Sequence, residues 1–127
     1  MKILIADDDR DQLMIRGMLL RQAGFEVVSA SDEASALEAA RKGHPGCAIV
    51  DLKFPDEQSG LRLIRGLKAL HADMIIVVLT GASLARLNSL PERALIHEVI
   101  GKGSPASLLL GKLQELQRVG EKIAPSG

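Results

Sequence analysis

Five polar residues of this sequence end or directly follow short apolar runs, where a buried strand would leave its sheet. They are Asp7, Asp8, Asp51, Thr80 and Lys102. Each alone has an ordinary explanation, since an aspartate after a strand often caps the next helix and a loop lysine is usually solvated. Parallel strands, however, end on the same edge of a sheet, where ligands bind in such folds. The five together therefore predict one shared pocket.

The residue types indicate which chemistry such a pocket could perform. Crowded carboxylates raise one another's pKa unless a cation lies among them, and hard oxygen ligands suit Mg²⁺. Asp51 could attack a phosphoryl group, because carboxylates form acyl-phosphate intermediates. Thr80 could donate a hydrogen bond to one phosphate oxygen, and Lys102 could pair with another. The pattern therefore predicts Mg²⁺-dependent phosphoryl transfer to Asp51.

The elements that would position these residues follow from the apolar patterns. Strands are expected over residues 3–6, 25–28, 47–51, 74–79 and 95–100. Helical spacing of apolar residues follows each strand, with Asp9 as the N-cap of the first helix and Ser31 or Asp32 as that of the second. The fourth helix is expected to be short, because Pro91 interrupts it, and Ser104-Pro105 is typical of the start of the last. Strands alternating with helices predict an α/β fold, a doubly wound parallel sheet with helices on both faces.

Composition narrows the class of protein. A chain of 127 residues is expected to form one domain, and with 46% hydrophobic but only 2% aromatic residues its core must be mainly aliphatic. Sixteen basic and sixteen acidic residues cancel, so no bulk charge favours direct binding to nucleic acid or membrane. Cys47 is expected to be a core residue. The longest apolar run is far shorter than a membrane span and no secretory signal is evident, so a cytoplasmic location is expected.

Several short motifs occur together in one order along the chain. An apolar run ends in Asp7-Asp8-Asp9, Val50-Asp51 is followed by Pro55 and Gly60, and Thr80-Gly81 precedes Lys102. Over essentially its whole length the sequence resembles the receiver domain of two-component response regulators. The resemblance implies a flavodoxin-like five-stranded sheet of order 2-1-3-4-5. It also implies a receiver domain over residues 1–119, followed by a polar tail or linker stub over 120–127.

The resemblance also assigns roles to the candidate residues. It implies that Asp51 is the phosphoacceptor, that Thr80 is the switch hydroxyl and that Lys102 pairs with the phosphate. Mg²⁺ would be bound by Asp7, Asp8, Asp51 and the backbone carbonyl of Lys53. A histidine kinase or histidine phosphotransfer protein would supply the phosphoryl group, and a downstream protein or a second copy of the chain would read the result. Such a domain catalyses its own phosphorylation and dephosphorylation but is not an enzyme in the metabolic sense.

The sequence departs from the family pattern at four places. Gly103 follows Lys102 where the family has a cis-proline, so we expect a trans bond and a lysine held less firmly between its two glycines. Val99 stands where the family often has an aromatic residue, and the chain contains no Tyr. The loop from Asp51 to Gly60 is one residue longer than the commonest form, and we hypothesise that the Lys53 side chain lies over the pocket mouth. The interruption of the fourth helix leaves the output surface undefined.

Three alternative functions compete with a phosphorylation switch. A pseudo-receiver would use the same fold for protein docking alone. A phosphohydrolase with an aspartyl-phosphate intermediate would need a second Asp two residues after the nucleophile, where this chain has Lys53. A flavodoxin-like nucleotide binder would need a glycine-rich loop after the first strand, which is absent. His44, His71 and His97 show no zinc-ligand spacing and are expected to be scattered surface or structural residues.

Overall fold

The computed structural model describes residues 1–123. Its five strands form one sheet in the order β2-β1-β3-β4-β5, with every neighbouring pair parallel. The strands are β1 (Lys2–Ala6), β2 (Glu26–Ala30), β3 (Cys47–Asp51), β4 (Ile75–Thr80) and β5 (Glu98–Gly101). The helices are α1 (Arg10–Gln22), α2 (Glu33–Gly43), α3 (Glu57–Leu70), α4 (Leu84–Asn88) and α5 (Ala106–Ile123), with a 3-10 turn η1 (Pro91–Leu95). The predicted fold class and strand order are confirmed.

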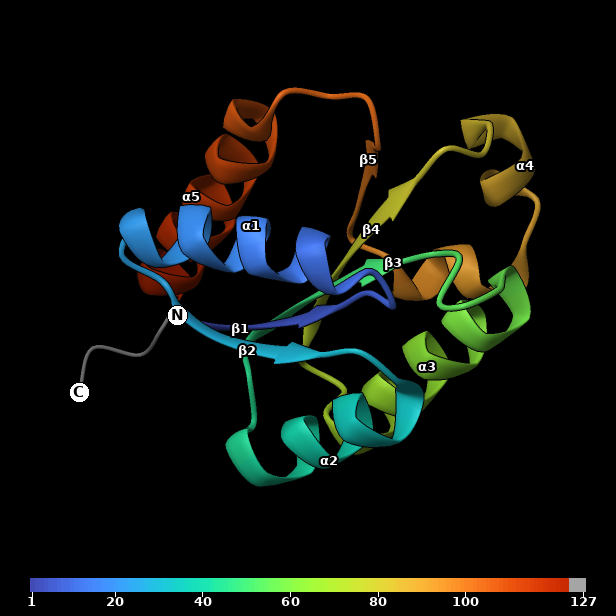
Figure 1. Cartoon of the computed structure of the whole chain (residues 1–127), viewed down its shortest axis with the longest axis horizontal. Helices are drawn as coiled ribbons and strands as arrows, with labels where there is room; N and C mark the ends of the chain where they lie inside the picture. The colour runs from blue at the N-terminus through green and yellow to red at the C-terminus, as the bar shows by residue number, and fades with distance from the viewer. Residues whose placement is uncertain (124–127) are drawn as a thin grey trace.

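Helices cover both faces of the sheet, with α1 and α5 on one side and α2 and α3 on the other (Figure 1). Because side chains alternate along a strand, each strand contributes to two separate cores. In β1, Ile3 and Ile5 pack with Leu13 of α1 and Leu113 of α5, whereas Leu4 belongs to the cluster formed with α2 and α3. All five residues of β3 are buried, as expected for a central parallel strand. The buried sheet therefore positions the residues that lie at the ends of its strands.

Short polar residues begin the helices where the sequence predicts them. The carboxylate of Asp9 accepts hydrogen bonds from the backbone N–H groups of Asp11 and Gln12, so Asp9 caps α1 as expected. Asp32, one of the two predicted candidates, caps α2 through the N–H of Ser35. Gly24 follows α1 at a φ of 96°, a left-handed conformation that only glycine adopts at low cost.

Several predicted boundaries were wrong, each for a local reason. The last strand begins at Glu98 instead of residue 95, because Pro91 starts a 3-10 turn that uses the apolar residues up to Leu95. Strand β2 runs over Glu26–Ala30 instead of 25–28, since its pairing with β1 continues past the polar Ser29. Helix α5 starts one residue after Pro105.

The C-terminal boundary differs in part from the expected tail. The polar tail expected from residue 120 overlaps α5, which continues to Ile123, and its residues 124–127 lie outside the described part. None of the helices within residues 1–123 is both long and apolar enough to cross a membrane.

Candidate functional site

The register of the sheet brings the predicted residues to one edge. Ala6 pairs with Val50, so the residues that follow, Asp7 and Asp51, leave the neighbouring strands β1 and β3 at the same level. On the other side, Thr80 at the end of β4 pairs with Gly101, the residue before Lys102. The structure thus brings all five predicted residues to one rim, where the strand order changes direction between β1 and β3.

Asp51 lies at the centre of this rim and is 4% exposed. One carboxylate oxygen, Oδ2, accepts a hydrogen bond from Lys102 Nζ at 2.8 Å. The other, Oδ1, accepts one from the backbone N–H of Lys53 at 3.1 Å. Burial raises the pKa of Asp51 and the charge of Asp7 raises it further, whereas the contacts with Lys102 and Lys53 act in the opposite direction. Asp51 is therefore a desolvated carboxylate whose charge is balanced mainly by one lysine.

Lys102 reaches Asp51 although a glycine lies on each side of it. Its backbone N–H donates to the carbonyl of Thr80 at 3.0 Å, and the turn that follows is closed by the N–H of Ser104 donating to Gly101 at 3.0 Å. The expected trans geometry of the Lys102–Gly103 bond is confirmed, since the cis peptide bond of the described residues is Phe54–Pro55. The backbone turn thus places the Lys102 ammonium group beside Asp51 without a following proline.

The acidic residues at the end of β1 have different surroundings. Asp7 is 2% exposed, while Asp8 is exposed. Oδ2 of Asp7 accepts a hydrogen bond from Arg16 Nη1 at 2.6 Å, and its Oδ1 accepts one from the backbone N–H of Asp9 at 3.0 Å. Asp7, like Asp51, therefore has a basic partner of its own.

The donor set fits a hard divalent cation. One carboxylate oxygen from each of Asp7, Asp8 and Asp51 lies within 4.8 Å of the other two. These residues line a cavity of about 410 Å³ together with Lys53, and such a volume leaves room for water molecules as further ligands. Oxygen ligands with space for water are what Mg²⁺ requires. Asp7, Asp8 and Asp51 are thus the side chains that could hold the ion, and Lys53, whose backbone carbonyl the resemblance implies as a further ligand, lines the same cavity.

A second cavity, of about 340 Å³, adjoins Asp51 on the β4 side. Thr80, which is buried, lines it together with Lys53 and Lys102. The Thr80 hydroxyl accepts a hydrogen bond from the N–H of Ala82 at 2.9 Å, which leaves its own proton available for donation. A phosphoryl group attached to Asp51 would find a hydroxyl donor and an ammonium group on this side.

The loop after Asp51 is fixed by an unusually close approach of two backbone segments. A Cβ atom added to Gly60, in the first turn of α3, would lie 2.0 Å from the carbonyl oxygen of Leu52. Only glycine can occupy this position while the helix stays where it is. Gly60 therefore sets how closely α3 packs against the segment that carries Asp51 and Lys53.

Two interactions of the rim were not predicted from the sequence. Arg16 was not predicted, although its position beside the buried Leu13, Gly17 and Leu20 of α1 could have indicated it, since helical side chains lean toward the N-terminus of their helix. The ion pair between Glu57 of α3 and Arg86 of α4 borders the second cavity. Arg16 and Asp7 are 9 residues apart in the sequence, and Glu57 and Arg86 are 29 apart.

The histidines are less scattered than expected. His44 and His71 stack with ring centroids 3.6 Å apart and an interplanar angle of 8°. Nε2 of His71 lies 2.9 Å from the carbonyl oxygen of Ala40, while Nδ1 of His97 accepts the backbone N–H of Ile76. The three residues therefore have structural partners away from the rim.

Comparison with protein families and solved structures agrees with this geometry. Residues 3–112 match the family described as the response regulator receiver domain. The receiver domain protein of Clostridium thermocellum superposes with a TM-score of 0.84 at 25% identity, over 96% of this chain and 98% of that one. A CheY-like receiver domain protein of Methanospirillum hungatei gives a TM-score of 0.81 at 27% identity, over 95% and 96% of the two chains.

Curated relatives are longer than this chain. The transcriptional regulatory protein PrrA of Mycobacterium tuberculosis is 34% identical over 82 residues, which are 65% of this chain and 35% of PrrA. The acid tolerance regulatory protein ActR of Rhizobium meliloti is 30% identical over 125 residues, which are 97% of this chain and 62% of ActR. The chain thus spans about a third of the length of PrrA and less than two thirds of ActR.

Proposed function

The chain belongs to the response regulator receiver family, and on that premise we propose that it is a phosphorylation switch with Asp51 as its acceptor. The observation that carries the proposal is the surroundings of Asp51. A buried carboxylate, 2.8 Å from Lys102, shares a cavity with Asp7, Asp8 and Asp9 and borders a second cavity lined by Thr80. Phosphoryl transfer depends mainly on positioning and charge neutralisation, which these residues supply.

The transfer step can be written from the side chains of the site. An Asp51 carboxylate oxygen attacks the phosphorus of a phosphohistidine, so that an O–P bond forms while the P–N bond breaks. The imidazole nitrogen keeps the electron pair and takes up a proton from solvent. Bound at Asp7, Asp8 and Asp51, Mg²⁺ would neutralise charge on the transferring oxygens. Lys102 then pairs with a phosphoryl oxygen instead of with Asp51, and Thr80 donates its hydroxyl proton to another.

The same residues explain how a phosphate could change the surface. The Thr80 hydroxyl accepts the N–H of Ala82, at the start of the segment that leads to α4. A hydroxyl that turns toward a phosphate would pull on this segment, and so bias an equilibrium between two arrangements of it. Val99 lies partly buried against the core on this side and cannot act as a rotating aromatic residue. We therefore expect the signal to travel through residues 80–88 alone.

The docking-only alternative is less consistent with the site. A pocket used only as a scaffold has no need for a desolvated carboxylate paired with a lysine, because burying charge without use is costly. The phosphohydrolase alternative still lacks a second acidic residue two positions after Asp51. We therefore favour the switch.

Intact mass spectrometry tests the proposal. Incubation with Mg²⁺ and a small phosphodonor should add one phosphoryl group to the parent chain and none to Asp51→Asn. Asp73→Asn, which removes the same charge from a side chain that is 81% exposed, is the matched control and should accept the group normally. Removing the metal with a chelator should prevent the addition. An adduct that persists in Asp51→Asn would refute the assignment.

A further inference from the structure

Arg16 contacts the metal-binding side of the rim and has no role in the function described above. We propose that Arg16 is a built-in counter-cation of Asp7 that competes with the divalent metal for this carboxylate, so that metal binding displaces its guanidinium. The inference rests on the proposed function of the site and adds a residue that sets its metal affinity.

The geometry leaves Asp7 fully engaged. Its Oδ2 lies 2.6 Å from Arg16 Nη1, and its Oδ1 accepts the N–H of Asp9. The two side chains are 2% and 16% exposed, respectively, so this ion pair is largely withdrawn from water. Charge-assisted hydrogen bonds of this length are the strong ones, and a partly buried pair is screened little by salt. A divalent cation that takes Asp7 as a ligand must therefore replace a strong existing partner.

The charge balance of the rim leads to the same conclusion. Asp7, Asp8 and Asp51 carry three negative charges, and Arg16 and Lys102, in direct contact with two of them, carry two positive ones. The five groups thus sum to one negative charge, and the opposite charges of Asp9 and Lys53, which also line the cavity, leave this sum unchanged. With the guanidinium withdrawn from the rim the sum is two negative charges, which match a divalent ion. Arg16 therefore opposes metal binding both by occupying a ligand atom and by its charge.

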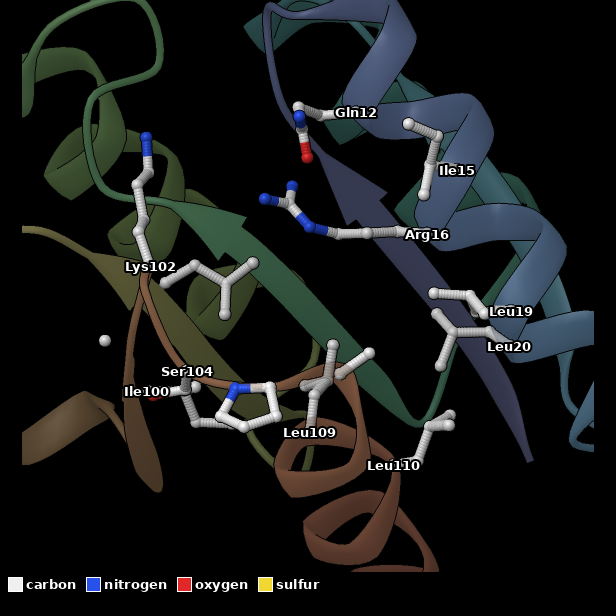
Figure 2. A pocket seen from close by; sticks show the side chains of 14 residues that line it. Gln12, Ile15, Arg16, Leu19, Leu20, Ile100, Lys102, Ser104, Leu109 and Leu110 are labelled. Atoms are coloured by element: carbon white, nitrogen blue, oxygen red, sulfur yellow. The ribbon is translucent and has the colours of Figure 1, made fainter.

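The structure offers a place for a displaced Arg16 side chain. A cavity of about 180 Å³ lies between α1 and the β5–α5 connection. Arg16 lines both this cavity and the cavity of about 410 Å³ that contains Asp7, Asp8 and Asp51. Figure 2 shows Arg16 extending from α1 into this space, opposite Lys102, with Leu109 and Leu110 of α5 below. Arginine stems pack well on apolar surface while the charged group stays near water. The side chain can thus leave Asp7 without a rearrangement of the helix.

Replacing Arg16 should strengthen metal binding. We expect Arg16→Gln to bind Mg²⁺ or Mn²⁺ about 10- to 100-fold more tightly than the parent chain, the equivalent of not having to break one hydrogen bond between charged groups. Arg21→Gln is the matched control, because Arg21 is an exposed arginine on the same helix with a long contact to the carbonyl of Val27. It removes the same charge at a distance from the rim and should leave the affinity unchanged.

The measurement is a titration of Mn²⁺ followed by the loss of its free-ion electron paramagnetic resonance signal, with calorimetry for Mg²⁺. Intrinsic fluorescence is not an option, since the chain has neither Trp nor Tyr. Because loss of an ion pair can weaken the fold, each variant is first checked by circular dichroism. Independently of any variant, the side-chain Nε–Hε resonance of Arg16 in the parent chain should shift on addition of Mg²⁺, while that of Arg21 should not.

The outcomes separate this inference from the proposed function. Tighter binding by Arg16→Gln alone, with a shifted Arg16 resonance in the parent, supports competition. Equal or weaker binding by Arg16→Gln, or an Arg16 resonance that ignores the metal, overturns it while leaving Asp51 phosphorylation intact. If no variant binds either metal and the parent chain accepts no phosphoryl group, both the inference and the proposed function are wrong.

Discussion

Replacing Gly60 with alanine should destabilise the fold by about 3 kcal/mol, even though the residue lies inside helix α3. A Cβ at this position would meet the carbonyl oxygen of Leu52 at 2.0 Å and its carbonyl carbon at 2.8 Å. Both atoms belong to the backbone that leaves β3, so no flexible side chain can move aside. The strand end and the first turn of α3 must separate instead.

The magnitude follows from two opposing effects. A carbon and an oxygen atom in contact normally lie at least about 3.3 Å apart, so the two segments must move apart by roughly 1.3 Å. Overpacking of a core by side-chain atoms costs about 1–3 kcal/mol and occasionally more, and the displacement of backbone atoms belongs just above that range, near 4 kcal/mol. Alanine is favoured over glycine within a helix by about 1 kcal/mol. The difference is a net loss of about 3 kcal/mol.

Urea unfolding followed by circular dichroism measures this loss, because the chain lacks the aromatic residues needed for fluorescence. Gly111→Ala is the matched control, since Gly111 lies in helix α5 with no atom within 4 Å of the added Cβ. The control should stabilise the protein by up to about 1 kcal/mol. If Gly60→Ala changes the free energy of unfolding by less than about 1 kcal/mol, the close approach of α3 to Leu52 is wrong.

Three further predictions concern single residues. Cys47 is fully buried, and burial raises the pKa of its thiol to about 12. A thiol reagent at mildly alkaline pH should therefore modify Cys47 only after unfolding. Labelling of the folded chain would contradict this prediction. Burial and then the charge of Lys68 lower the pKa of His97, so the folded state binds that proton less tightly than the unfolded chain. The free energy of unfolding should therefore fall as pH decreases through about 6.5, and His97→Asn should reduce this slope in urea titrations at several pH values. Lys53 is exposed and lines both cavities beside Asp51, where its side chain would hinder the attack of water on the acyl phosphate. Lys53→Ala should therefore lose its phosphoryl group several-fold faster than the parent chain, as followed by mass spectrometry. An unchanged rate of dephosphorylation would show that Lys53 has no role at the pocket mouth.

Features that depend on local sequence patterns were predicted correctly. Asp9 was predicted as the cap of α1 because its short side chain can accept hydrogen bonds from the first backbone N–H groups of a helix, which have no partner within the helix. The structure confirms this prediction. Asp51 and Thr80 could be placed on one rim because parallel strands share a direction, whatever the details of packing. The start of β5 was missed, since the apolar Leu95 fits a strand and a 3-10 turn equally well and Pro91 decided between them.

Arg16 shows what a sequence pattern leaves open, since its helical position can place it near the buried face of α1 but does not identify its partner. Its partner Asp7 lies nine residues away, and the contact depends on how α1 is rotated against the sheet. That rotation is set by Leu13 and Leu20, which are buried against the sheet. Nothing in the residue type distinguishes Arg16 from the exposed Arg21. Long-range pairs of this kind emerge only from packing.

The assignment of Asp51 as the phosphoacceptor is tested most directly by locating the phosphoryl group chemically. An acyl phosphate is reduced by borohydride to an alcohol, which changes the mass of the peptide that carries it. After phosphorylation with Mg²⁺ and a small phosphodonor, reduction is expected at residue 51 alone, and none is expected when the metal is removed. Reduction at Asp7, Asp8 or another carboxylate, or no reduced peptide at all, would contradict it.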